Sequence, residues 1–215
     1  MCKKFSVIDL LVATTNPGKF AEVQAFLSKL PLRILSLKDV TAPPVVVEDG
    51  DTFEANALKK ARTLAQFSGL ITLADDSGIE VDALGGAPGI YSARYCGVEG
   101  DDDQNNEKLL RELQNVAEEK RIARYVCVLA LCIPGAGDMK EWLVRESCEG
   151  RIGRVIESPQ GTNGFGYDPL FFFPPLGKTF GEIDRGTKAT VSHRGKALQK
   201  LVEMLPSLVD LTASP

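Results

Sequence analysis

Apolar and polar residues follow two patterns along the chain, which predict strands and helices in alternation. Strand-like segments, mostly apolar, occupy residues 6–13, 33–36, 70–74 and 125–133. Helical spacing of apolar residues instead covers residues 20–30, 53–65, 109–116 and 197–205. Such an alternation is typical of an α/β fold.

The connections predict how the strands pair. A strand at residues 6–13 that is followed by a helix favours parallel pairing. The turn at residues 134–138 lies between the apolar run and the alternating residues 141–148, which favours an antiparallel hairpin. We therefore expect a mixed central sheet flanked by helices. Residues 97–106 are predicted to form a polar loop, and residues 206–215 a frayed tail.

Three residues predict where helices begin and end. Thr52 precedes one helical pattern and Ser192 another, and both are good N-cap residues. Gly69 follows the first of these patterns and is expected to end that helix.

Composition limits the class of protein. A length of 215 residues, with 25% charged and 44% hydrophobic residues, favours one compact domain over residues 1–215. The net charge of −4 argues against binding to nucleic-acid polymers, although a few lysines and arginines could hold a small polyanion. No apolar run is long enough to predict a membrane span. Five cysteines without a C-x-x-C pair favour a reduced, cytoplasmic setting.

The first candidate chemistry is the sequence A-D-D-S-G, which follows the apolar run at residues 70–74. Adjacent carboxylates repel each other, so Asp75 and Asp76 need a proton, a hydrogen-bond donor or a cation such as Mg2+ nearby. One interpretation is a solvated Asp-rich turn ending in Ser-Gly. The other is a cation site, which is favoured by the glycine-rich loop at residues 85–89 because such loops commonly serve binding.

The second candidate is T-T-N-P-G-K, residues 14–19, between a strand and a helix. Backbone N–H groups at a helix N-terminus suit a phosphate group, and Lys19 could add a charge. The spacing is not that of a Walker-type phosphate loop. A plain connection, with a threonine or Asn16 as the helix cap, is the alternative.

The third candidate lies in the last third of the chain. Within the glycine-rich residues 158–168, Phe165 could stack on a planar base, and Asp168 could accept a hydrogen bond from its edge. Phe171–Phe173 are better explained as an aromatic plug in the sheet. His193 and Arg194 lie in the first turn of the final helix, where cations are unfavourable unless an anionic or carbonyl-rich ligand offsets the helix dipole. With a single histidine, a zinc site is not expected.

Taken in order, T-T-N-P-G-K, A-D-D-S-G, L-G-G-A-P-G-I-Y-S-A-R-Y, G-F-G-Y-D-P-L-F and S-H-R-G resemble the motifs of the inosine triphosphate pyrophosphatase family, from residue 11 to about 201. The resemblance implies Mg2+-dependent hydrolysis of the non-standard purine nucleotides ITP, dITP or XTP to the monophosphate and pyrophosphate, which removes them from the nucleotide pool. It also implies an elongated α/β fold with a nucleotide cleft between two lobes, usually as a homodimer.

The resemblance also implies roles for single residues. Asp76 would be the catalytic acid–base and a metal ligand, with Glu48 as a second ligand. The substrate would be bound by Thr14, Thr15, Asn16, Pro17, Gly18, Lys19, Ser77, Phe165, Gly166, Tyr167, Asp168, Lys188, His193 and Arg194. Many relatives have consecutive glutamates where this chain has Val47-Glu48. They also have a second glutamate at the position where this chain has Ala55. Asp49, Glu54 or Asp75 could therefore substitute as ligands.

Base choice follows from hydrogen-bond donors and acceptors. Hypoxanthine and xanthine present a 6-carbonyl and an N1–H, which match Arg194 and Asp168, whereas adenine would leave both residues unpaired. Two other functions stay open on the residues: a pyrophosphatase of related fold that acts on modified pyrimidine or methylated purine nucleotides, and a nucleotide sensor without catalysis.

Overall fold

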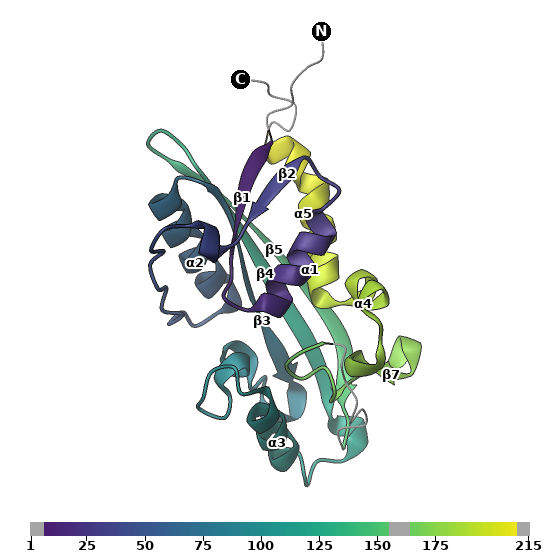
Figure 1. Ribbon diagram of the computed structural model, residues 1–215. Coiled ribbons are helices and arrows are strands. Elements are labelled where there is room, and N and C mark those ends of the chain that lie inside the picture. Colours follow the sequence, from purple (N-terminus) through teal and green to yellow (C-terminus); the bar gives the residue numbers. More distant parts are fainter. Residues whose placement is uncertain (1–6, 155–163, 210–215) are drawn as a thin grey trace. The chain divides into compact units, whose positions relative to one another are not determined.

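The structure is a computed structural model that describes residues 7–154 and 164–209, and it contains one seven-stranded sheet with helices around it (Figure 1). The strands are β1 (Ile8–Ala13), β2 (Leu32–Leu35), β3 (Ile71–Val81), β4 (Ile122–Pro134), β5 (Met139–Ile152), β6 (Phe171–Phe173) and β7 (Lys178–Thr179). The helices are α1 (Pro17–Leu27), α2 (Phe53–Ser68), α3 (Asp102–Glu112), α4 (Arg185–Val191) and α5 (His193–Leu208).

The sheet is mixed, as predicted. Its strand order is β2-β1-β3-β4-β5-β6-β7. β1 pairs in parallel with β2 and β3, whereas β6 pairs antiparallel with β5 and β7. β4 and β5 are neighbours joined by residues 135–138 alone, which confirms the predicted hairpin.

The chain divides into two compact units. The first consists of the chain up to Asp76, Val128–Arg145 and the segment from Ala197 onward; the second consists of Ser77–Cys127 and Glu146–Lys196. Strands β3, β4 and β5 each contribute residues to both units.

The first unit is built on β1, with α1 and α2 alongside β1 and β2 (Figure 1). Thr52 caps α2 by accepting a hydrogen bond from the N–H of Ala55, and Gly69 ends the helix in the left-handed conformation at φ 69°. Both predictions are confirmed. The buried face of α2 includes Ala57, Ala61 and Leu64, as its spacing predicts.

The second unit has an aromatic core. Phe171 and Phe173 on β6 are buried there, with ring centroids 4.9 Å and 5.6 Å from that of Phe180. Tyr125 on β4 joins the same cluster, with its ring 4.7 Å from Phe171. The predicted aromatic plug is therefore present.

The Ser-Gly turn predicted after Asp76 is wrong, because Asp75 to Gly78 lie inside the long strand β3. Gly78 serves packing instead of a turn. A Cβ atom there would lie 2.4 Å from both the carbonyl oxygen of Gly89 and the Oγ of Ser92. Only glycine leaves room for this approach of Ser92, whose Oγ accepts a hydrogen bond from the N–H of Ile79 at 2.9 Å.

Two other predictions require correction, and one helix was missed. α3 begins at Asp102, inside the predicted loop, because Asp101 caps it and Asp102 and Asp103 complement the helix dipole. α5 continues through Pro206 to Leu208 and so includes the start of the predicted tail, while Leu205 is buried. The short helix α4 was not predicted. None of the helices described is long and apolar enough to cross a membrane.

Candidate active site

The first unit gathers lysines and acids near the end of its part of β3. The side chain of Asp75 is buried and pairs with Lys19 on α1, with 2.5 Å between Oδ1 and Nζ. Lys60 on α2 donates to Oε1 of Glu48 at 2.9 Å and to the backbone carbonyl of Asp75 at 2.8 Å. Two cations and two acids therefore surround the backbone that leads to Asp76.

Asp76 is the unusual member of this group. Its side chain is only 6% exposed, and its Oδ2 has no hydrogen-bond partner among the residues that the structure describes. Burial raises the pKa of Asp76 to about 6; Lys60 and Lys19 oppose the rise, and Glu48 and Asp75 add to it. A carboxylate with a raised pKa and an unused buried oxygen is typical of a functional site.

This pKa predicts a pH-dependent stability of the metal-free protein. Between the unfolded pKa of aspartate, near 4, and the folded value of about 6, only the folded state holds the proton, so stability falls as pH rises through this window and then levels off. The difference between the two pKa values corresponds to about 3 kcal/mol of unfolding free energy. Urea unfolding of the wild type and of Asp76→Asn, both in EDTA, isolates the contribution of this residue. The free energy of unfolding of Asp76→Asn, relative to that of the wild type, should increase from pH 4 to pH 7. A difference that does not change with pH would contradict the raised pKa of Asp76.

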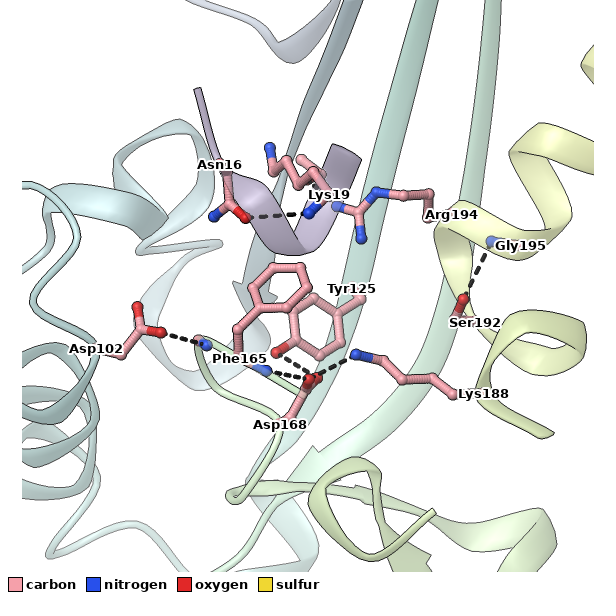
Figure 2. A network of polar contacts seen from close by, with 12 residues as sticks. Asn16, Lys19, Asp102, Tyr125, Phe165, Asp168, Lys188, Ser192, Arg194 and Gly195 are labelled. Carbon is pink, nitrogen blue, oxygen red and sulfur yellow. Dashed lines mark hydrogen bonds and ion pairs between the residues drawn. The ribbon is translucent and has the colours of Figure 1, made fainter. Parts of the chain in front are cut away.

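Residues 14–16 connect β1 to α1, and residues 17–19 form the first turn of α1. Oδ1 of Asn16 accepts a hydrogen bond from the backbone N–H of Gly18 at 2.8 Å. It also accepts one from the backbone N–H of Lys19 at 3.0 Å (Figure 2). Pro17 occupies the first helical position, where its missing N–H is tolerated. Asn16 is therefore the helix cap, as the alternative interpretation predicts. A phosphate at this end of α1 stays a prediction, and it would compete with Asn16 for the same N–H groups.

The residues of this unit fit a magnesium ion whose coordination shell is completed by a substrate. Mg2+ in such sites is bound by one or two carboxylates together with water and phosphate oxygens. Asp76 offers a buried oxygen without a partner, and Glu48 acts electrostatically on it. Within residues 7–154 and 164–209, no three His, Cys, Asp or Glu side chains form a group that could hold a metal without such help.

The other acids considered as ligands differ in their surroundings. Asp49 pairs with Lys59 at 2.5 Å, and Glu54 pairs with Arg145 at 2.8 Å. Asp75 pairs with Lys19. Its negative charge raises the pKa of Asp76, as that of Glu48 does. The electrostatic effects therefore favour Glu48 and Asp75 over the other two acids.

The second unit holds a buried ion pair. Asp168, 2% exposed, accepts at Oδ2 from Nζ of Lys188 at 2.5 Å and from the backbone N–H of Phe165 at 2.8 Å (Figure 2). Its Oδ1 accepts from the hydroxyl of Tyr125 at 3.3 Å. Lys188 comes from α4, so this short helix supplies the cation that makes the buried carboxylate tolerable.

Two cations flank the ring of Phe165, which is half-buried. Nζ of Lys188 lies 5.0 Å from the ring centroid, and the guanidinium carbon of Arg194 lies 5.6 Å from it. Arg194 also donates to Oγ of Ser77 at 2.8 Å. The predicted residues Ser77, Phe165, Asp168, Lys188 and Arg194 are thus linked by direct contacts within this unit.

The first residues of α5 and Tyr167 are held by contacts within the second unit. Oγ of Ser192 accepts from the N–H of Gly195 at 3.1 Å, so Ser192 caps the helix as predicted (Figure 2). His193 is buried and stacks on Tyr125, with centroids 4.6 Å apart and planes 9° apart. Tyr167 is buried too, and its hydroxyl donates to the carbonyl of Ser92 at 2.8 Å, so it anchors the loop; contact with a base stays a prediction.

Sequence reasoning missed several residues that hold this group together. Gly166 is clamped by α3, because its N–H donates to Oδ2 of Asp102 at 2.6 Å and its carbonyl accepts from Nδ2 of Asn106 at 3.0 Å. Asp102 and Asn106 are four residues apart and so share one helix face, which is a pattern that sequence could have offered. Lys60 and Tyr125 gave no such pattern. In the sequence, Lys60 is indistinguishable from a lysine on a helix surface, and Tyr125 from an aromatic residue of the core.

The open mixed sheet with flanking helices makes this an α/β protein. The model of the Ham1 family matches residues 10–204, so the chain belongs to the Ham1 family. A "dITP/XTP pyrophosphatase" of Geobacter sulfurreducens is 50% identical over 197 residues, which are 91% of this chain and 96% of that protein. One of Shouchella clausii is 48% identical over 92% of this chain and 96% of its own length. The solved HAM1 protein of Coxiella burnetii superimposes with a TM-score of 0.82 at 37% identity, covering 94% of this chain and all of that one.

Proposed function

We propose that the protein hydrolyses the non-standard purine nucleotides ITP, dITP and XTP to the nucleoside monophosphate and pyrophosphate. The observation that carries the proposal is the buried, unpartnered oxygen of Asp76 beside Lys19, Lys60 and Glu48. Relatives that share about half of their residues with this chain bear the name dITP/XTP pyrophosphatase, which supports the same substrates here.

The proposed reaction is attack of water on the α-phosphorus. The bond from this phosphorus to the bridging oxygen breaks, and pyrophosphate leaves. Lys19 and Lys60 would neutralise part of the charge on the triphosphate. Mg2+, bound by Asp76 and Glu48, would supply further charge neutralisation on the phosphate oxygens.

Asp76 has a second part in the proposal. In the metal-free protein its pKa of about 6 leaves it mostly ionised at neutral pH, and the ionised carboxylate would orient the attacking water and take up its proton.

Base selection would belong to the second unit. The ring of Phe165 could stack on the purine, Arg194 could donate to a 6-carbonyl, and Asp168 could accept from N1–H. Adenine carries the opposite pattern at these two positions. With adenine these two hydrogen bonds to charged groups would be lost, at roughly 1.5–3 kcal/mol each.

The proposal extends to the setting of the enzyme. Because β3, β4 and β5 run through both units, and the family model covers nearly the whole chain, we treat residues 1–215 as one nucleotide pyrophosphatase domain. The reduced thiols of Cys127, Cys132 and Cys148 support a cytoplasmic site of action. The family resemblance suggests a homodimer, which light scattering would test.

A pyrophosphate-release assay over a nucleotide panel tests the function. With Mg2+, turnover of ITP, dITP and XTP should exceed that of ATP by at least tenfold, and EDTA should abolish it. Preference for dUTP or 7-methyl-GTP would indicate the related-fold pyrophosphatase instead. Tight nucleotide binding without any turnover would indicate a sensor.

A further inference from the structure

We propose that Tyr125 is a positioning residue for base recognition, which holds Asp168 through its hydroxyl and His193 through its ring. The inference rests on the proposed function and assigns a part in it to a residue that lies on β4, outside the motifs of the resemblance. Tyr125 does not need to touch the substrate in this role.

The hydroxyl contact fixes the orientation of the Asp168 carboxylate. Oδ2 is held by Lys188 and by the N–H of Phe165, at 2.5 Å and 2.8 Å. Both of these donors act on one oxygen of the carboxylate. The Tyr125 hydroxyl, 3.3 Å from Oδ1, adds a donor on the other oxygen, so the two oxygens are distinguished by their partners.

Tyr125 is suited to be a permanent donor. Its side chain is 7% exposed in the aromatic core of the second unit. Burial, together with the nearby charge of Asp168, raises the pKa of Tyr125 well above its usual value. The phenol therefore stays protonated over the whole range in which an enzyme would be assayed.

The ring contact fixes the imidazole of His193. The two rings lie nearly parallel, 9° apart, with centroids at 4.6 Å. The Tyr125 ring is itself held by Phe171 at 4.7 Å and by Phe180 at 5.8 Å. One side chain thereby links a residue of the Phe165–Asp168 loop to a residue at the start of α5, and both are candidates for reading the base.

The variant Tyr125→Phe separates these two contacts, because it keeps the ring and removes only the hydroxyl. We expect KM for ITP to rise roughly tenfold, which corresponds to the loss of one hydrogen bond to a charged group. The kcat should stay within about threefold, because Asp76 and the lysines are untouched. KM for ATP should change little, so the preference for ITP over ATP should fall.

Tyr95→Phe is the matched control. It removes a hydroxyl that also bonds to a carboxylate, that of Glu112, but outside the contacts around Asp168. Tyr125→Leu removes the ring as well, and kcat/KM for ITP should fall further than in Tyr125→Phe. Circular-dichroism melting of all three variants shows that they are folded at the assay temperature.

The outcomes separate this inference from the proposed function. If the wild type prefers ITP, and Tyr125→Phe keeps both the KM and the preference, the positioning role is overturned and the function stands. Equal losses with ITP and ATP would indicate a purely structural tyrosine and overturn it too. A wild type that hydrolyses no nucleotide would overturn both proposals.

Discussion

The Asp76→Asn protein should still bind ITP but release pyrophosphate roughly 10²–10⁴-fold more slowly than the wild type. Asparagine keeps the shape of the side chain but can neither take up a proton nor offer a charged oxygen to a metal. The buried Oδ2 of Asp76 lacks a hydrogen-bond partner among the described residues, so the change breaks no hydrogen bond at this atom. Fluorescence titration with ITP and steady-state pyrophosphate release would measure binding and turnover separately.

The control for this variant is Asp51→Asn. Asp51 is an exposed acid of the same unit, just before the cap of α2. Its replacement should change kcat less than about twofold, as is usual for surface positions away from structural features. Near-normal turnover of Asp76→Asn would remove Asp76 from the role of acid–base.

The Lys188→Met protein should lose about 3–5 kcal/mol of unfolding free energy. Lys188 and Asp168 are both almost fully buried, and methionine would leave the carboxylate without its charged partner. ITP binding should weaken as well, because Lys188 also lies over the ring of Phe165. Urea unfolding at neutral pH would measure the change in stability.

Two further variants test the cause. Lys59→Met breaks an ion pair with Asp49 that is largely exposed, and should cost much less stability than Lys188→Met. Adding Asp168→Asn to Lys188→Met should restore part of the lost stability, because it removes the uncompensated charge. If the double variant is less stable than Lys188→Met, loss of packing and not burial of charge explains the effect.

Local patterns were sufficient for much of the fold. α2 followed from its apolar spacing, the cap Thr52 and the left-handed Gly69, all of which act within one segment of the chain. The mixed sheet followed from a strand that enters a helix and from a short turn between two strands. The D-D-S-G segment was misread because its partners are distant in sequence: Lys19 satisfies Asp75, and Ser92 packs on Gly78.

In the candidate site, too, the features visible in the sequence differ from those that depend on contacts between distant residues. Motif residues such as Lys19, Asp168 and Arg194 could be named from the sequence, because their chemistry is visible in the residue types. Tyr125 could not be, since it lies in an apolar strand, and Asn106 has only its spacing from Asp102 to distinguish it within a polar helix. Their roles depend on hydrogen bonds to Asp168 and Gly166, which only the folded chain brings together.

Hydrolysis of ITP in ¹⁸O-labelled water, with mass spectrometry of both products, tests the central claim most directly. Attack on the α-phosphorus places the heavy oxygen in the monophosphate and none in the pyrophosphate, and we predict this result. Label in the pyrophosphate, or release of orthophosphate instead, would contradict the account.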